Sequence, residues 1–372
     1  MWLLLPFLMV AQQGGMVREG DRFVRDFQGS GPVGKRLRVN AHGPVTVQAG
    51  VGNTFSYTVR VSVHARTESE ARRVLEHYSV RVARQGEYTV LTAPAGPVVS
   101  TVVVRAPRLE DVVIATSDGA VDASGVDGRL DVNTGAGDVT ADRIQGDCTV
   151  STGGGDIHVG TVGGALRCSS GAGKVQVGTV RGTADLRSAG GDIMVNEVLG
   201  MLRAETGGGG IHISRAGAGV TASTGGGLVI VDQAGGVVSV RNMAGPVSIG
   251  SAAGVQCESV SGGIHVSNVT GGLRASTSLG NIVANLLGGK LTDSFLSTAN
   301  GDITVFIPSN VGVNIRAQID SADSPRRMAV DFPSLQVRRQ GRVVVAEGAV
   351  NGGGPLLAIS ATVGTIYIRK QR

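Results

Sequence analysis

The sequence contains few aromatic residues, few charged residues and very little cysteine. Aromatic side chains make up 3% of the 372 residues and charged side chains 17%, whereas 41% are hydrophobic. A disordered chain combines low hydrophobicity with high net charge, so this composition excludes a mainly disordered protein. Proline occurs only 11 times and the glycines do not recur at every third position, which excludes collagen. The three cysteines form no CxxC pair, which excludes a disulfide framework and a Cys/His metal site.

Glycine, in contrast, is abundant and belongs to an internal repeat. It accounts for 59 residues, about twice its ordinary usage. From Gln145 onward, six successive blocks of 18 residues resemble one another, and they begin with QGDCTVSTGGGDIHVGTV and GGALRCSSGAGKVQVGTV. One block before them and three after them bring the total to ten copies between about residues 126 and 308.

The spacing of apolar residues within a block predicts two short strands. In the third block these residues are Ala184, Leu186, Ile193, Val195 and Val198. Alternation at every second position is typical of a strand with one buried face, and the intervening S/T-G-G-G-D segment allows a tight turn. Two short strands cannot bury that face alone, so neighbouring copies must stack. The repeat therefore predicts an all-β fold, a single-stranded β-solenoid of about ten 18-residue coils.

The hand of the coil is the next question. Because 18 is three times six, a left-handed hexapeptide helix is an alternative. That fold needs an aliphatic residue at every sixth position, which these blocks lack. Parallel crossovers are usually right-handed, so we predict a right-handed β-solenoid or β-helix.

The regions outside the repeat have a different character. Residues Thr67-Glu68-Ser69-Glu70 form a capping box, which predicts a short helix between strands. One sizeable insertion is expected near Ser294–Ala299. The predicted organisation is a signal peptide (1–11), a linker (12–29), a strand-rich N-terminal cap with one short helix (30–110), the β-solenoid (111–309) and C-terminal cap strands (310–372).

The first eleven residues suggest export. Met1–Ala11 is apolar and uncharged. It is too short to cross a bilayer as a helix, but it matches the apolar region of a secretory signal. The alternative is a buried N-terminal strand. We predict an exported protein in the periplasm or at the cell surface, with no integral membrane segment.

Several segments resemble a known family. They are the strand–helix–strand start, the stretch TVVVRAPRLEDVVIATSDGAV, the repeated S/T-G-G-G-D-I-x-V motif and the closing NGGGPLLAISATVGTIYIRK. Together they are similar to the bacterial putative-adhesin domain family, over roughly residues 30–370. The resemblance implies a β-solenoid domain of unassigned biochemical function, and it transfers no catalytic residues.

The cysteines have a structural explanation. Cys148, Cys168 and Cys257 occupy inward positions of their coils, so we predict three buried, free core thiols that act as small hydrophobic side chains. Cys148 and Cys168 are one coil apart but offset by two residues. That offset separates their Cα atoms by about 8 Å, beyond the ~7 Å limit for a disulfide.

Two groups of polar residues recur in register. Asp138, Asp156 and Asp192 follow the glycine turn and form a speculative surface ladder, which could hold Ca²⁺ or supply an acid/base pair. An Asp that bonds the local backbone of a turn is the commoner reason for this residue. The second group is His158, His212 and His265, which point outward and lie three coils apart, too far to share one metal ion. We predict no catalytic, cofactor or metal site.

Charge is distributed unevenly along the chain. Residues 111–309 carry a net charge of −6, whereas residues 1–110 carry +6 and residues 310–372 carry +5. The basic runs are Arg326-Arg327, Arg338-Arg339-Gln340-Gly341-Arg342 and Arg369-Lys370-Gln371-Arg372. They could contact an anionic envelope polymer or lipid headgroups, or they could simply be solvated. A nucleic-acid partner is not expected, because no stacking aromatic residues or binding motif accompany these runs.

These observations favour a non-enzymatic exported β-solenoid, either adhesin-like or an envelope scaffold. Its partner would be an envelope polysaccharide or another surface protein, with the oligomeric state left open. The first alternative is a carbohydrate-active β-helix enzyme or a glycan-binding protein. The second is a bactofilin-like polymerising scaffold.

Overall fold

The computed structural model describes residues 12–31, 34–50, 54–288, 290–320 and 328–371. The predicted signal peptide and the Arg326-Arg327 run lie outside these residues. The chain is a β-solenoid of about eleven turns with a spacing of about 18 residues, and 63% of it is strand. It divides into two units, Met1–Thr183 and Ala184–Arg372. The hand of the coil remains a prediction.

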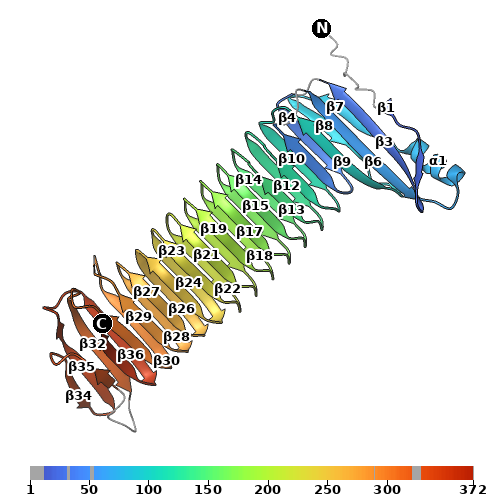
Figure 1. Ribbon diagram of the computed structural model, residues 1–372. Helices are drawn as coiled ribbons and strands as arrows, with labels where there is room; N and C mark the ends of the chain where they lie inside the picture. Colours follow the sequence, from blue (N-terminus) through green and yellow to red (C-terminus); the bar gives the residue numbers. More distant parts are fainter. Residues whose placement is uncertain (1–11, 32–33, 51–53, 289, 321–327, 372) are drawn as a thin grey trace. The chain divides into compact units, whose positions relative to one another are not determined.

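Each coil contributes one strand to each of two parallel sheets (Figure 1). Sheet 1 contains the first strand of every coil and sheet 2 the second. In the first unit, Leu130 of one coil pairs with Cys148 of the next, which is the predicted 18-residue register. The first-unit strands are β10 (Asp111–Thr116), β12 (Arg129–Thr134), β14 (Cys148–Thr152) and β16 (Leu166–Ser170) in sheet 1, and β11 (Val121–Ser124), β13 (Val139–Asp142), β15 (Ile157–Val162) and β17 (Val175–Val180) in sheet 2.

The second unit repeats this arrangement. Its sheet 1 strands are β18 (Ala184–Ser188), β20 (Leu202–Thr206), β22 (Val220–Thr224), β24 (Val237–Ala244), β26 (Gly254–Ser261), β28 (Leu273–Leu279) and β30 (Ser294–Asn300). Its sheet 2 strands are β19 (Ile193–Val198), β21 (Ile211–Ala216), β23 (Val229–Ala234), β25 (Val247–Ala252), β27 (Ile264–Val269), β29 (Ile282–Leu286) and β31 (Ile303–Ile307). The ten predicted repeats thus form coils from β12–β13 to β30–β31, and the β10–β11 coil adds one more.

The core lies between the inner faces of the two sheets. The five inward residues predicted in the third block are all buried, and Ala184, the most accessible of these five, is 4% exposed. The coils contain no aromatic residue between Tyr88 and Phe295. Valine, isoleucine, leucine, alanine and cysteine therefore fill the space between the sheets.

A buried polar ladder accompanies this core, and the repeat analysis missed it. The Thr152 hydroxyl donates to the carbonyl of Gly137 on the previous coil (2.9 Å) and accepts from the Gly155 amide within its own turn (3.2 Å). Buried polar groups need such partners, and a Ser, Thr or Asn before most of the glycine turns ties two coils together in this way. The ladder consists of Thr116, Thr134, Thr152 and Ser170 in the first unit and Ser188, Thr206, Thr224, Asn242, Thr277 and Thr298 in the second. Ser259 is buried at the same position, but its hydroxyl has no hydrogen-bond partner.

At the N-terminal end the coils do not stack in sequence order. The coil formed by β4 (Arg36–Ala41) and β5 (Val45–Ala49) pairs on one side with β10 and β11. On the other side it pairs with β8 (Tyr88–Thr92) and β9 (Val99–Ala106). The first coil in the sequence is therefore held between two later coils.

Antiparallel strands and the helix complete this end. The added strands are β1 (Gln12–Gln13), β2 (Val17–Glu19), β3 (Arg22–Gly31), β6 (Phe55–His64) and β7 (Arg81–Gln85). The prediction of a linker over residues 12–29 was wrong, because β3 pairs with β6 and buries Phe23 and Phe27. Helix α1 (Glu68–His77) is confirmed, with the Thr67 hydroxyl accepting from the Glu70 amide. Among the described residues, no helix is long and apolar enough to span a membrane.

At the C-terminal end, the last coil of the sequence is also held between strands that precede it. Strand β36 (Leu356–Val363) pairs with β30 and with β32 (Val313–Asp320), and β37 (Ile366–Lys370) pairs with β31 and β33 (Met328–Val330). The hairpin of β34 (Gln336–Gln340) and β35 (Val343–Val350) continues sheet 1 beyond β32.

The expected insertion lies elsewhere than predicted. Ser294–Ala299 belongs to the regular strand β30, in which Phe295 pairs with Arg274 of the preceding coil. This register step is longer than the usual 18 residues, so the extra residues of the sequence fall between Leu286 and Ser294. The insertion precedes β30, because buried and outward side chains already alternate from Ser294 onward.

Candidate functional site

The aspartate ladder bonds to backbone amides of the following coil. Asp138 accepts a hydrogen bond from the amide of Asp156 (2.8 Å), and Asp156 accepts one from the amide of Lys174 (2.7 Å). In the second unit, Asp192 does the same for Gly210 (2.8 Å). These carboxylates therefore connect adjacent coils. Within the described ranges, no group of three or more His, Cys, Asp or Glu side chains is placed to hold a metal ion.

The three cysteines are buried and unbridged. In the sheet register, Cys148 lies opposite Leu166, and Cys168 lies opposite Val150, so the two thiols are offset by two residues. Burial raises the pKa of Cys148 and of Cys257 to about 12, and that of Cys168 well above its ordinary value. A thiol that stays protonated is neither a nucleophile nor a metal ligand at neutral pH.

The three histidines are exposed on the outer face of sheet 2, as the repeat predicted. Each contacts a different neighbour: His158 lies 3.3 Å from the Gln176 amide oxygen and His265 lies 3.1 Å from the Ser267 hydroxyl. His212 Nε2 lies 3.2 Å from Asp232 Oδ2. The structure therefore brings none of them together into one site.

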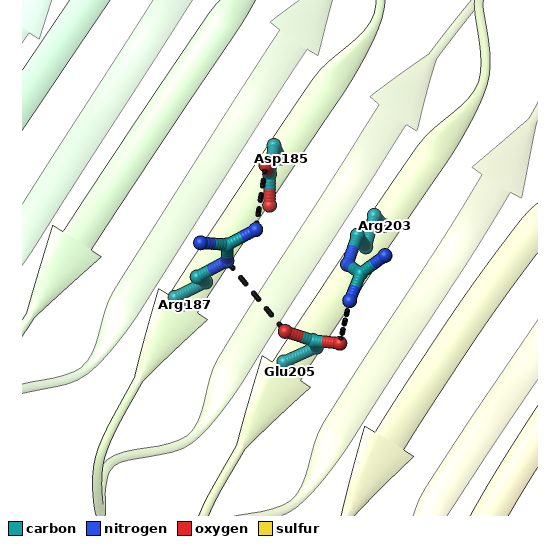
Figure 2. A network of polar contacts seen from close by, with 4 residues as sticks. All are labelled: Asp185, Arg187, Arg203 and Glu205. Carbon is teal, nitrogen blue, oxygen red and sulfur yellow. Dashed lines mark hydrogen bonds and ion pairs between the residues drawn. The ribbon is translucent and has the colours of Figure 1, made fainter.

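The outer face of sheet 1 in the second unit carries alternating charges (Figure 2). Asp185 lies opposite Arg203, and Arg187 lies opposite Glu205. Arg187 contacts Asp185 at 3.1 Å and Glu205 at 3.5 Å, and Arg203 also pairs with Glu205. Each exposed pair contributes at most about 1 kcal/mol to stability. Their main consequence is that neighbouring coils meet with opposite charges instead of like ones.

A shallow polar hollow lies on the outer face of sheet 2. Its volume is about 640 Å³, and two carboxylates, Glu197 and Asp232, line it. Glu197 lies 3.6 Å from Arg215, and Asp232 contacts His212. The other lining residues are Asn196, Ser214, Arg215, Gln233 and Gly250. These two carboxylates are the candidates for the acid/base pair that a carbohydrate-active enzyme would require.

A second hollow, which we call the aromatic cleft, lies on sheet 2 towards the end of the second unit. Its volume is about 770 Å³. Strands β29, β31 and β37 supply outward side chains to it, and Asp331 follows β33. The lining residues are Asn285, Thr304, Phe306, Asp331, Tyr367, Arg369, Lys370 and Gln371.

The strand register places the aromatic and polar side chains next to one another. Thr304 pairs with Tyr367, and Phe306 pairs with Arg369 on one side and with Asn285 on the other. All five side chains face outward, because they alternate with the buried positions along β29, β31 and β37. The aromatic cleft is therefore a direct product of the strand alternation in the three coils that contain β29, β31 and β37.

Electrostatic contacts fix the position of Arg369. Its guanidinium carbon lies 5.2 Å from the centroid of the Tyr367 ring, and its Nη1 lies 2.8 Å from Asp331 Oδ1. Asp331 also accepts a hydrogen bond from the Lys370 amide (3.3 Å). The Arg369 guanidinium, followed by the Lys370 amide, lowers the pKa of the Asp331 carboxyl group. The carboxylate is thus charged near neutral pH and orients the guanidinium beside the aromatic ring.

Sequence reasoning missed this cleft. The basic run beginning at Arg369 was identified, but Phe306 and Tyr367 were not. The available signal was their position: each is the outward residue of a strand (ITVFI and IYIRK) in a chain that has very few aromatic residues. What the sequence could not supply was the adjacency of β31 and β37, which are separated by the whole C-terminal cap.

Comparison with known proteins gives one family and two solved structures. The family model described as Toastrack DUF4097 matches residues 35–234. No curated protein matches the chain. A crystal structure of a putative adhesin from Bacteroides fragilis NCTC 9343 is 14% identical, covers 74% of this chain and 97% of its own, and has a TM-score of 0.26. A putative cell adhesion protein from Clostridium sporogenes ATCC 15579 is 8% identical, covers 94% of this chain and 100% of its own, and has a TM-score of 0.16.

The family match covers more than half of the chain. It includes the N-terminal cap from β4 onward and the regular coils as far as β23. The match confirms the resemblance that the repeat motifs indicated. The chain belongs to the Toastrack DUF4097 family.

Proposed function

We propose that this protein is an exported, non-enzymatic β-solenoid that interacts through its surface, as an adhesin-like or envelope scaffold protein. The observation that carries the proposal is the use of polar residues in the repeat. Asp138 and Asp156 bond to the next coil, and Thr152 bonds to the previous one. The recurrent polar groups therefore stabilise a regular surface.

The charged side chains outside the turns support the same proposal. On sheet 1, Arg187 bridges Asp185 and Glu205. Both carboxylates are thus engaged in ion pairs with arginine, as expected of a structural surface. Support for export comes from the apolar Met1–Ala11 segment, which matches a secretory signal.

Localisation is tested by fractionation and protease shaving of intact cells, followed by mass-spectrometric mapping. We expect no peptide from Met1–Ala11 in the mature chain. Peptides released from intact cells would place the protein at the surface, and release only after the outer barrier is permeabilised would place it in the periplasm. A cytoplasmic chain that retains Met1–Ala11 would contradict export.

The non-enzymatic part is tested with envelope polysaccharides. We expect the purified chain to release no reducing ends from them. If reducing ends appear, and if Glu197→Gln and Asp232→Asn abolish their release while Asp320→Asn does not, the protein is a hydrolase acting at the polar hollow. The Asp320 side chain is exposed on β32 and does not line that hollow, so this variant controls for a general loss of acidic charge.

A further inference from the structure

We propose that the aromatic cleft binds an acidic polysaccharide, with Phe306 and Tyr367 contacting sugar rings and Arg369 contacting the acidic group. This inference rests on the proposed function and names the ligand class and the place where it binds. The cleft lies entirely within the second unit, on strands β29, β31 and β37 and on Asp331.

The first argument concerns aromatic residues. Phe306 and Tyr367 are both only half-buried on an outer strand face, although aromatic side chains are only 3% of this chain. Two half-buried aromatic rings within one hollow leave apolar surface in contact with water, which a bound ligand would cover. The C–H face of a sugar ring is apolar and flat enough to pack on an aromatic ring through dispersion contacts.

The second argument concerns charge. One guanidinium N–H of Arg369 contacts Asp331, and an arginine has five N–H donors, so several remain for a ligand. Because Asp331 already orients the guanidinium, binding an acidic group costs little side-chain entropy. A guanidinium also matches a carboxylate or phosphate with two parallel hydrogen bonds. The segment 310–372 carries +5, whereas residues 111–309 carry −6, so an anionic polymer is favoured at this end of the second unit.

The third argument concerns neutral polar groups. Asn285 and Thr304 lie on the same outer face as the two aromatic rings. Their amide and hydroxyl groups can each donate and accept, which suits the hydroxyl groups of a sugar. A volume of about 770 Å³ is within the usual range for a ligand pocket.

The number of cations distinguishes this ligand from other anionic partners. Among the described residues that line the cleft, Arg369 and Lys370 are the two that carry positive charge, and Asp331 offsets part of it. Electrostatic binding to an anionic lipid surface typically needs a cluster of four to eight basic residues. Nucleic-acid binding needs an extended basic patch that follows the backbone. Two aromatic rings, three neutral polar side chains and two cations suit a chain of hydroxyl-rich rings with widely spaced acidic groups.

The test measures binding of the full chain to polygalacturonate, to a phosphomannan and to neutral dextran of similar length. We expect binding to at least one acidic polymer, weakening with added salt, and at least tenfold weaker binding to dextran. Phe306→Ala and Tyr367→Ala should each weaken binding about tenfold, and Arg369→Gln should reduce both the affinity and its salt dependence. The two acidic polymers distinguish a carboxylate ligand from a phosphate ligand.

Two variants provide matched controls. Phe295→Ala removes an exposed aromatic ring from sheet 1, and Arg274→Gln removes an exposed arginine from the neighbouring strand of the same sheet. Neither residue lines the cleft, so both variants should bind normally. Failure to bind either acidic polymer would overturn the proposal, as would equal loss in the control variants. Tighter binding to anionic lipid vesicles or to oligo-dT, abolished by Tyr367→Ala, would also overturn it. If binding fails but shaving shows export, the proposed function stands without this site.

Discussion

At both ends of the β-solenoid, the coil that is first or last in the sequence is paired with other strands on both of its sides. At the N-terminal end, the first coil of the sequence, β4–β5, is held between two coils that follow it. At the C-terminal end, the last coil, β36–β37, is held between the coil β30–β31 and the strands β32 and β33, which precede it. In both cases a terminal coil cannot separate without breaking strand pairing on two sides. A solenoid can thus close its ends with chain that is distant in sequence.

The ends differ in where they place aromatic residues. At the N-terminal end Phe27 and Phe55 are fully buried, and the Phe27 ring lies 6.0 Å from that of Tyr78. At the C-terminal end Phe306 and Tyr367 face outward into the cleft. The same residue types therefore build a core under the helix at one end and a surface at the other. We therefore expect the buried aromatic residues at the N-terminal end to contribute mainly to stability. The outward ones at the C-terminal end are those that we propose contribute to binding.

Core truncation should give the largest effect and tests that assignment directly. Phe27→Ala removes a fully buried ring, and we expect a loss of about 3–5 kcal/mol in the free energy of unfolding. Phe306→Ala removes a half-buried outward ring and should cost less than about 1 kcal/mol. Urea unfolding followed by circular dichroism, together with hydrogen exchange of β3 and β6, measures both. Similar losses for the two variants would remove the distinction between the ends.

The regular coils between the ends depend on the buried polar ladder, which gives the next largest effect. Thr206→Val keeps the side-chain shape but leaves the Gly191 carbonyl and the Gly209 amide without their hydroxyl partner. Unpaired buried polar groups cost about 1–3 kcal/mol, so urea unfolding should shift accordingly. Thr221→Val on the outer face of β22 is the matched control and should be nearly neutral. Equal stability of both variants would show that the ladder does not stabilise the coils.

The arginines on the two edge strands of sheet 1, β7 and β34, should have a weaker effect, and they test whether the two ends are protected in the same way. Among the described residues, β7 pairs only with β8 and β34 only with β35, so each leaves one edge unpaired. Both strands carry two exposed arginines, Arg81 and Arg84 in β7 and Arg338 and Arg339 in β34. Charged edges oppose strand pairing between molecules. This offers a physical reason for positive charge at both ends of the sequence.

Neutralising one edge should therefore promote association. We expect Arg338→Thr/Arg339→Thr to form concentration-dependent oligomers, measured by light scattering after size exclusion, under conditions where Arg274→Gln matches the unmodified chain. Arg81→Thr/Arg84→Thr should behave in the same way. If neither pair changes the oligomeric state, the arginines do not protect the edges.

Much of the fold could be predicted because the sequence repeat shows the alternation of inward and outward residues along each strand. Leu186 and Val195 were assigned to the core from their spacing alone, and Thr67 was assigned to the start of a helix from its capping box. The order of coils at the two ends could not be predicted. It depends on pairing between distant segments, such as β4 with β8, that have no repeat relationship to one another.

For the same reason, only part of the candidate site could be predicted from the sequence. Asp138 was recognised as a residue that recurs after the turn, but its bond to the next coil needed the stacking register. Phe306 and Arg369 are far apart in the sequence and adjacent in the sheet only because β37 lies beside β31. Local patterns thus predict which residues face outward, whereas non-local strand pairing decides which of them meet.

The smallest predicted effect concerns pH and the support of the aromatic cleft. The pKa of Asp331 is lowered in the folded protein by Arg369. A carboxyl group with a lowered pKa adds stability above its unfolded pKa of about 4, and this contribution is lost as the pH falls through the folded pKa. Asp331→Asn should therefore lower the Tm slightly at pH 6, and the difference should vanish in strong acid.

Asp320→Asn is the matched control for this measurement, since its carboxylate lies exposed on β32 outside the cleft. Its Tm should follow that of the unmodified chain between pH 3 and pH 6, apart from its general effect on net charge. Because Asp331 is itself exposed, the shift at pH 6 should be small and should shrink further with added salt. A Tm difference that stayed constant across the whole pH range would mean that Asp331 supports the cleft through packing and not through its charge.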